Sequence, residues 1–304
     1  MLHVIVLGAG AGGGFPQWNS AGAGCMRARA LDSRVQPRTQ ASLAVSADGQ
    51  RWLLINASPD LRAQINATPA LHPRAVPLRN SPIAAVVLTG AEVDTIAGLL
   101  TLRERQSFRV YGTQQSLAVL AENPIFGALD PAIVPREALA LGTPFAPHDG
   151  AGLALSVTIE AFPVPGKVPL FAEVSADPGI VEGGEAVGLA ISAGGAILHY
   201  IPGCAAMTPA LSVRLRNAAC VLFDGTLFDD DEMITAGAGP KTGRRMGHMP
   251  MTETLAAFAP LGVARRIFIH VNNTNPALLG DSAERATLDA AGWEVAEDGM
   301  VITL

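Results

Sequence analysis

Short apolar runs alternate along this chain with segments in which apolar residues recur at helical spacing. The apolar runs predict buried strands at residues 2–7, 42–46, 52–56, 83–88, 108–111, 153–162, 187–192, 196–201, 218–223, 266–270, 293–296 and 300–304. The helical spacing predicts helices at residues 58–66, 93–105, 114–121, 252–258 and 282–291. Strands and helices are interspersed, which favours a mixed α/β architecture.

Turn signals indicate how these elements are connected. Asp48-Gly49 predicts a hairpin between two early strands, and Gly194-Gly195 predicts another. Asp298-Gly299 joins the last two strands, and Ser58 followed by proline is typical of a helix start. Loops are expected at 122–152 and 171–186. No repeat or low-complexity linker interrupts the chain, so we expect one domain over residues 1–304.

Charge is sparse in this sequence. Asp, Glu, Lys and Arg make up 16% of the residues, against about 25% in average proteins, while 49% are hydrophobic. That composition excludes a disordered chain and predicts a large buried core. The net charge is −6 and no basic run exists, so nucleic acid is an improbable partner.

The cysteines and the N-terminal segment bear on location. Cys25, Cys204 and Cys220 are an odd number without paired spacing, which suits a reducing cytoplasm. The first apolar run is too short for a signal peptide, and no run of about 18 apolar residues predicts a membrane span. We therefore expect a cytoplasmic protein.

Two glycine-rich segments suggest nucleotide binding only superficially. Residues 8–13 satisfy G-x-G-x-x-G after a strand, but the following Gly14-Phe15-Pro16 is a poor helix start. We interpret these glycines as allowing close approach of the backbone near a site. Residues 237–242 resemble a phosphate-binding loop, but Pro240 stands where glycine is required.

Five polar side chains near predicted strand ends could form a metal site. Glu92 and Asp94 follow one strand, Asp224 ends another, and His270 ends a third, with His248 between two methionines. Each has an ordinary structural interpretation, such as helix or turn capping for the carboxylates. Together they form a set of oxygen and imidazole ligands, although spacing alone does not show that they converge.

Several longer strings carry a resemblance that covers nearly the whole chain. These strings are residues 12–19 (GGGFPQWN), 38–40 (RTQ), 56–60 (NASPD), 98–104 (GLLTLRE), 224–226 (DGT), 247–250 (GHMP) and 272–276 (NNTNP). In this order they resemble the pyrroloquinoline quinone (PQQ) biosynthesis protein B family of the metallo-β-lactamase superfamily. The resemblance implies an αββα sandwich, two mixed sheets flanked by helices, with its site at one edge of the sheets.

The chain departs from the superfamily pattern at several ligand positions. The His-x-His-x-Asp-His motif falls on Gly90, Glu92, Asp94 and Thr95, so two potential ligands are missing. The Pro-Gly-His motif falls on a segment ending in Lys167, whose ammonium would repel a metal but could hold an anion.

A second departure concerns a structural zinc site. Many relatives carry a Cys-x-Cys-x-x-Cys zinc motif where this chain has Ser20, Gly22 and Cys25. One thiol cannot complete a tetrahedral zinc site, and we predict that the zinc is absent.

The resemblance implies a step in making PQQ, namely iron- and oxygen-dependent hydroxylation of a tyrosine-derived precursor containing a cross-linked Glu–Tyr unit. In that interpretation Fe(II) is held by Glu92, Asp94, Asp224 and His270, while His248 and Asp224 are the catalytic residues. From charge and hydrogen-bonding chemistry we add candidate substrate-binding residues: Arg38, Lys167, Lys241, Arg245 and Asn273.

The missing ligands favour a competing hypothesis, a non-catalytic carrier of PQQ or its precursor with a degenerate metal site. Zinc hydrolase chemistry is disfavoured, because the chain lacks a His-rich pocket. The expected partner is a small molecule, the PQQ precursor or PQQ itself, and a homodimer is a candidate assembly.

Overall fold

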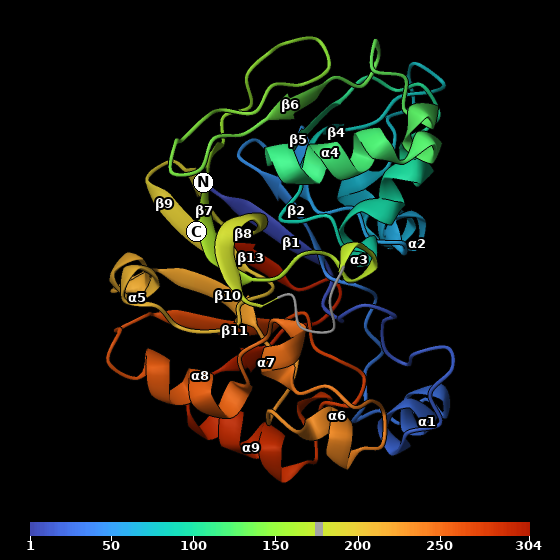
Figure 1. The fold of residues 1–304 in the computed structure, drawn as a ribbon. Helices are drawn as coiled ribbons and strands as arrows, with labels where there is room; N and C mark the ends of the chain where they lie inside the picture. Colours follow the sequence, from blue (N-terminus) through green and yellow to red (C-terminus); the bar gives the residue numbers. More distant parts are fainter. Residues whose placement is uncertain (174–178) are drawn as a thin grey trace.

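Two sheets form the centre of the computed structural model, which describes residues 1–173 and 179–304 (Figure 1). The first sheet has the order β13-β1-β2-β3-β4-β5-β6. Its strands are β1 (His3–Gly8), β2 (Ser42–Ser46), β3 (Trp52–Ile55), β4 (Ile83–Val87), β5 (Arg109–Gly112), β6 (Arg136–Ala138) and β13 (Val301–Thr303). Pairing is antiparallel from β13 to β3 and parallel from β3 to β6, so the sheet is mixed.

The second sheet has the order β12-β11-β10-β9-β8-β7. Its strands are β7 (Thr158–Gly166), β8 (Val181–Ala193), β9 (Ala196–Ile201), β10 (Cys220–Asp224), β11 (Arg265–Ile269) and β12 (Glu294–Val295). Strands β9 to β12 pair in parallel, whereas β7, β8 and β9 form an antiparallel meander. Parallel strands have their carboxyl ends at one edge, where ligand sites of α/β proteins are found.

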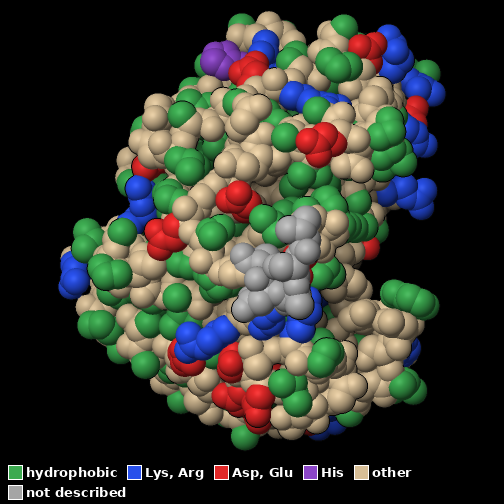
Figure 2. All heavy atoms as spheres, viewed as in Figure 1, with side chains coloured by type: hydrophobic (Ala, Val, Ile, Leu, Met, Phe, Trp, Pro, Cys, Tyr) green, Lys and Arg blue, Asp and Glu red, His purple; other side chains and the backbone are tan. Residues whose placement is uncertain are grey.

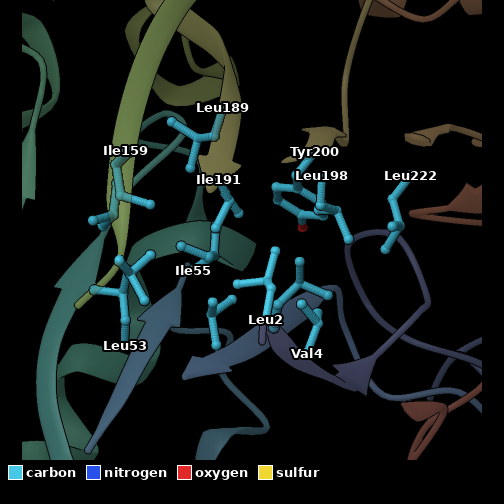
Figure 3. Packing of buried hydrophobic residues seen from close by; sticks show 14 of the residues in the cluster. Leu2, Val4, Leu53, Ile55, Ile159, Leu189, Ile191, Leu198, Tyr200 and Leu222 are labelled. Carbon is cyan, nitrogen blue, oxygen red and sulfur yellow. The ribbon is translucent and has the colours of Figure 1, made fainter. Parts of the chain in front are cut away.

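Alternation of side chains along the strands creates the layers. On β3, Leu53 and Ile55 face the second sheet, whereas Trp52 and Leu54 face helices. The inter-sheet layer includes side chains from both sheets, such as Leu53 and Leu189 (Figure 3). Because each sheet buries both faces, its central strands are continuous apolar runs, which accounts for the apolar, charge-poor composition.

Helices cover the outer face of each sheet, which confirms the predicted αββα sandwich (Figure 1). Against the first sheet pack α2 (Leu61–Ala67), α3 (Val93–Ile96), α4 (Gln114–Glu122) and the 3₁₀ helices η1 (Pro69–Leu71), η2 (Ala97–Leu102) and η3 (Pro124–Ala128). Against the second sheet pack α1 (Ala23–Arg29), α5 (Pro209–Leu215), α8 (Met251–Phe258), α9 (Ala283–Ala290) and η5 (Pro276–Leu278). The remaining short helices are η4 (Leu170–Ala172), α6 (Glu232–Thr235) and α7 (Gly243–Met246).

The two ends of the chain meet in the first sheet. His3 on β1 lies opposite Thr303 on β13, and the backbone of Leu2 bonds to that of Leu304. The C-terminal half therefore builds the second sheet and then returns to the first one. No helix within residues 1–173 or 179–304 is long and apolar enough to cross a membrane.

Several predicted elements are wrong in detail. The helix expected at 93–105 is a single α-helical turn followed by η2, because the Gly98 amide bonds to the Ala57 carbonyl instead of continuing the helix. The last two strands are not a hairpin, since β12 joins the second sheet and β13 the first. Ser58 does not cap α2; its hydroxyl contacts Gln64, and Asp60 precedes the helix.

Other differences concern segments that the sequence pattern left as loops. Strand β8 begins at Val181, inside the loop expected at 171–186, and η4 overlaps the start of this loop. Residues 174–178 of the expected loop lie outside the described residues. Strand β6 and η3 lie in the other expected loop. Helices α1 and α5 were not predicted, because seven-residue helices carry a weak periodic signal.

Candidate metal centre and substrate cavity

The predicted metal-site residues come together at the carboxyl ends of the parallel strands. Asp94 follows β4, Asp224 ends β10, and His270 follows β11. His248 arrives from the turn after α7, where Gly247 adopts the left-handed conformation at φ 91°. One ligand atom from each of Asp224, His248 and His270 lies within 4.8 Å of the others. The structure thus places three of the predicted residues in a group that could hold a metal.

Asp224 is completely buried and fully engaged by hydrogen bonds. Its Oδ1 accepts from the amide and the hydroxyl of Thr226, at 3.0 and 2.7 Å. Its Oδ2 accepts from the amide of Cys204 and from Nδ1 of His248, both at 2.8 Å. These bonds use both lone pairs of each oxygen, so the carboxylate is arranged to hold and orient its neighbours.

The same contacts assign the tautomers of the two imidazoles. His248 Nδ1 faces the Asp224 carboxylate, which only accepts, so this nitrogen carries the hydrogen. The Thr226 hydroxyl gives its proton to Asp224, and its oxygen is then free to accept from His270 Nδ1 at 2.9 Å. Nε2 of His248 is therefore bare, the form in which histidine binds metals.

Nε2 of His270 lies 3.0 Å from Oδ2 of Asp94 and donates a hydrogen bond to this carboxylate. A metal ion bound between these two atoms would take the place of this hydrogen. Burial alone would raise the pKa of Asp94, but the hydrogen bond from His270 outweighs it and holds that pKa below its usual value. Burial likewise opposes charge on His270, yet Asp94 raises the pKa of His270 above its usual value. This pair is suited to hold a cation.

The donor chemistry of this centre fits a divalent transition metal. His248 Nε2 has no hydrogen-bond partner among the described residues, and the His248 and His270 rings stack with centroids 5.3 Å apart. Two imidazoles and one carboxylate are a ligand set typical of non-haem iron, and they also suit zinc. His270 has φ 61°, a conformation uncommon outside glycine, as found where a side chain is held for function.

A cavity of about 820 Å³ opens beside this centre. Its polar wall includes Asp94, His248 and His270, and its apolar wall includes Val93, Phe171, Val187 and Met246. That volume suits a small organic ligand. Figure 2 shows one face of the molecule, on which charged side chains are scattered among uncharged ones.

Glycines bring the first loop against the cavity. Gly12 lines the cavity, and a Cβ atom there would lie 3.6 Å from Oδ2 of Asp94. At Gly8 a Cβ would collide with the carbonyl of Gln40 at 2.3 Å. No helix follows Gly13 directly, so this segment serves close approach and not dinucleotide binding.

The lysine at the superfamily's histidine position is held by two carboxylates. Lys167 Nζ lies 3.3 Å from Glu92 and 3.0 Å from Glu173. Burial raises the pKa of Glu92, while the charge of Lys167 opposes that rise. Glu92 Oε1 also accepts from the Leu170 amide. The structure therefore pairs Glu92 with an ammonium group, although it was predicted as a metal ligand.

The predicted substrate-binding residues fall into two groups. Lys167 and Lys241 line the cavity, and Arg245 is next to them through a shared contact with Glu173. Arg38 does not line the cavity, because its buried guanidinium bonds to the Ala296 carbonyl and to Glu297. Asn273 also lies outside it, since its side chain bonds to Gln17 and Asn272. Those two residues have structural contacts in place of the expected ligand contacts.

The positions of the missing ligands are also defined. Gly90 pairs with Ala186 of β8, and a Cβ at Gly90 would lie 3.1 Å from the Glu185 carbonyl. The Thr95 hydroxyl donates to the Glu92 carbonyl at 2.8 Å. Neither position offers an imidazole or a carboxylate to the cavity.

At the expected structural zinc position the loop is closed by hydrogen bonds. Ser20 Oγ accepts from the Gly22 amide, and the Arg29 guanidinium donates to the carbonyls of Gln17 and Ser20. Cys25 is buried, and its thiol contacts Oδ1 of Asn273 at 3.6 Å.

Two residues of the site were missed from the sequence. Thr226 forms hydrogen bonds with Asp224 and both imidazoles. It could have been identified from the sequence, because it lies in the Asp-Gly-Thr string that carries the family resemblance. No sequence pattern pointed to Glu173, which lies in a segment that was interpreted as a loop.

Comparison with known proteins gives a consistent picture. A family model described as beta-lactamase superfamily domain matches residues 51–271. The chain is 58% identical to coenzyme PQQ synthesis protein B of Gluconacetobacter diazotrophicus, with 100% of both chains covered. It is 54% identical to the protein of the same name from Xanthomonas euvesicatoria, also over the full length of both.

Solved structures agree with the sequence relatives. The crystal structure of Zn²⁺-bound PqqB from Methylobacterium extorquens superposes with a TM-score of 0.95 at 50% identity, covering 99% of this chain and 100% of that one. A diphosphatase of the PhnP family matches with a TM-score of 0.70 at 18% identity over 100% and 98% of the two chains, which shows the fold alone. On this evidence the chain belongs to the coenzyme PQQ synthesis protein B family of the beta-lactamase superfamily.

Proposed function

We propose that the protein acts in PQQ biosynthesis as an iron- and oxygen-dependent hydroxylase of a tyrosine-derived precursor that contains a cross-linked Glu–Tyr unit. Family membership supports the place in PQQ biosynthesis. The observation that supports metal chemistry is the Asp94–His270 pair, which brings a carboxylate and an imidazole together beside the bare Nε2 of His248.

Asp94, His270 and His248 would hold Fe(II) from one side, as a carboxylate and two imidazoles do in non-haem iron enzymes. Bound there, Fe(II) would supply the activation of oxygen. Asp224, assigned from the sequence as both ligand and catalytic residue, would instead orient His248 through Nδ1 and anchor Thr226. If His248 does not bind the metal, its Nε2 would carry a proton instead.

The rest of the cavity suits an aromatic, carboxylate-rich molecule. Lys167 and Lys241 on the wall would bind carboxylates, with Arg245 behind them. Val93, Phe171 and Met246 would pack against the aromatic ring and exclude water from it.

A carrier function remains a second candidate because of Gly90 and Thr95. These positions lack the side chains that would add two ligands, and Lys167 brings positive charge near the centre. In that case the cavity would bind PQQ or its precursor without a metal.

An anaerobic Fe(II) titration of metal-free protein distinguishes the two functions. For the hydroxylase we expect one equivalent of iron to bind and His270→Ala to lose it, with oxygen-dependent hydroxylation of the precursor by the loaded protein. Wild-type protein that binds PQQ but no iron would support the carrier. If His270→Ala keeps iron affinity, the ligand assignment is wrong.

A further inference from the structure

An asparagine that the proposed function leaves without a role lines the cavity next to the metal centre. Asn272 follows His270 by two positions, and both residues line the cavity. The backbone amide of Asn272 donates to the carbonyl of Thr226, whose hydroxyl contacts both imidazoles. The position of Asn272 is therefore fixed by the same backbone that builds the metal centre.

Hydrogen bonds assign the orientation of the Asn272 side-chain amide. Its Nδ2 lies 2.7 Å from Oγ1 of Thr274 and 3.2 Å from the sulfur of Met233, and both of these atoms can accept. The Thr274 hydroxyl donates its single hydrogen to the carboxylate of Glu232, so it presents a lone pair to Asn272. The nitrogen of the amide therefore faces Thr274, and the oxygen faces away from it.

Glu232 sets the direction of this chain of hydrogen bonds. Its Oε1 accepts from the Thr274 hydroxyl, and its Oε2 accepts from the Phe228 amide at 2.7 Å. Burial raises the pKa of Glu232 to about 7, so above this pH the carboxylate only accepts. Neither Glu232 nor Thr274 is among the described residues that line the cavity, so both act on it through Asn272.

The remaining hydrogen-bonding capacity of Asn272 defines what it can offer to a ligand. Both hydrogens of Nδ2 are directed to protein acceptors. Oδ1 accepts one hydrogen bond, from Nδ2 of Asn273 at 3.2 Å, and a carbonyl oxygen has two lone pairs. One neutral acceptor site is left, next to Met233 on the cavity wall. Such a site suits a phenolic hydroxyl better than an ammonium group, whose charge is costly to desolvate beside an apolar side chain.

We propose that Asn272 is a specificity-determining residue that accepts a hydrogen bond from the phenolic hydroxyl of an aromatic ligand, and that Thr274 and Glu232 hold its amide in the orientation this bond needs. The ligand class rests on the proposed function, in which the precursor contains a tyrosine-derived ring. A site that bonds a hydroxyl discriminates against the analogue without it, because the acceptor is then buried without a partner. Asn272 contacts the ligand, whereas Thr274 and Glu232 are positioning residues.

Two dipeptides that differ by one hydroxyl, glutamyl-tyrosine and glutamyl-phenylalanine, test this proposal. Calorimetry measures their binding to full-length protein, as purified, at pH 8 under argon, where oxygen cannot alter the peptides. We expect the wild type to bind the tyrosine peptide about tenfold more tightly than the phenylalanine peptide. Asn272→Leu keeps the size of the side chain but removes the acceptor. It should lose the preference, through weaker binding of the tyrosine peptide alone.

Variants of Thr274 distinguish positioning of the amide from mere support of the wall. Thr274→Val removes the hydroxyl at nearly the same size, so the Asn272 amide can turn and the preference should fall below about threefold. Thr274→Ser keeps the hydroxyl and should keep the preference. Thr287→Val is the matched control, because the exposed Thr287 hydroxyl bonds to the Ala283 carbonyl within α9, and it should leave the preference unchanged.

Folded Asn272→Leu that still prefers the tyrosine peptide would overturn the proposal. Wild-type protein that binds the two peptides equally, or binds neither, would do the same. If Asn272→Leu does not fold, the Thr274 variants decide, and an equal preference in Thr274→Val and Thr274→Ser counts against the proposal. A failure to bind iron or to hydroxylate the precursor would contradict the hydroxylase function but would leave this result intact, because the assay measures no turnover.

Discussion

Asp94 and His270 are 176 positions apart and extend from different sheets, yet a 3.0 Å hydrogen bond joins Oδ2 of the first to Nε2 of the second. The pair exists only when the two sheets are packed together. A cation bound there would consequently tie the sheets to each other, and ligand binding to the folded form alone stabilises a protein.

The two carboxylates of the β4–α3 turn should differ in their importance for metal binding. Asp94 faces His270, whereas Glu92 faces Lys167. We expect Asp94→Asn to weaken Fe(II) binding at least tenfold, and Glu92→Gln to change it less than threefold. Anaerobic titration of both variants checks this, and equal losses would return Glu92 to the ligand set.

Adding a histidine at position 95 should strengthen the centre. Thr95 lines the cavity next to Asp94, and an imidazole there can supply the ligand that the superfamily pattern has at this position. Thr95→His should raise Fe(II) affinity about tenfold over wild type, with Thr95→Leu as the control without a ligand. Equal affinities of the two variants would show that position 95 does not reach the metal.

Stability should depend on pH through the carboxyl group of Glu232. Burial raises its pKa to about 7, although the Phe228 amide and the Thr274 hydroxyl bond to it. Between the unfolded pKa and about 7 the native state holds the extra proton, so stability falls as pH rises through this window.

Glu232→Gln removes this penalty. Urea unfolding should show a gain of up to about 3 kcal/mol at pH 8 and a much smaller gain at pH 5. The exposed Glu122→Gln should show no such difference between the two pH values. A gain that is the same at both pH values would mean that the Glu232 charge is not its source.

The loop that contains Ser20 and Gly22 should depend on Arg29. Arg29→Met removes two hydrogen bonds to carbonyls and should cost about 1 kcal/mol of unfolding free energy. The predicted absence of a structural zinc is tested separately. In the variant His270→Ala, which lacks the metal centre, a chelator should leave the melting temperature unchanged. Zinc that stays bound in this background and is released by Cys25→Ser would contradict the prediction.

Gly98 should be intolerant of a side chain. A Cβ atom there would lie 2.0 Å from the Ser58 carbonyl oxygen, and the backbone at both positions is fixed by the bond from the Gly98 amide to Ala57. Gly98→Ala should destabilise the protein by about 3 kcal/mol or more. Gly127→Ala, with open space around its Cβ, should be nearly neutral. Thermal unfolding of both variants checks this prediction.

Strands were predictable from the sequence because both faces of each central strand are buried. The run that became β10 is apolar throughout, and its end at Asp224 marks the edge of the sheet. The short helices were harder to predict, as the segment after Asp94 shows. Its apolar spacing fits an α-helix, but the Gly98 amide donates to the Ala57 carbonyl and the α-helix ends.

The candidate site was predictable where a motif and a strand end coincide. Asp224, His248 and His270 meet as expected, because parallel strands end at the same edge. Arg38 shows the limit of reasoning from charge: a guanidinium can satisfy buried carbonyls as well as a ligand, and the sequence does not distinguish these uses. The contacts of Glu173 could not be predicted, because the three cations around it come together only in the folded chain.

The pairing of β1 with β13 also has a consequence for the order of folding. Strand β1 is completed on one side by β2 and on the other by β13, a strand that is made much later than β1. Until then, β1 has an open edge and its apolar side chains lack the partner layer of the second sheet. We expect the edge of β1 to stay unpaired until β13 has been made, so the first sheet is completed late in folding.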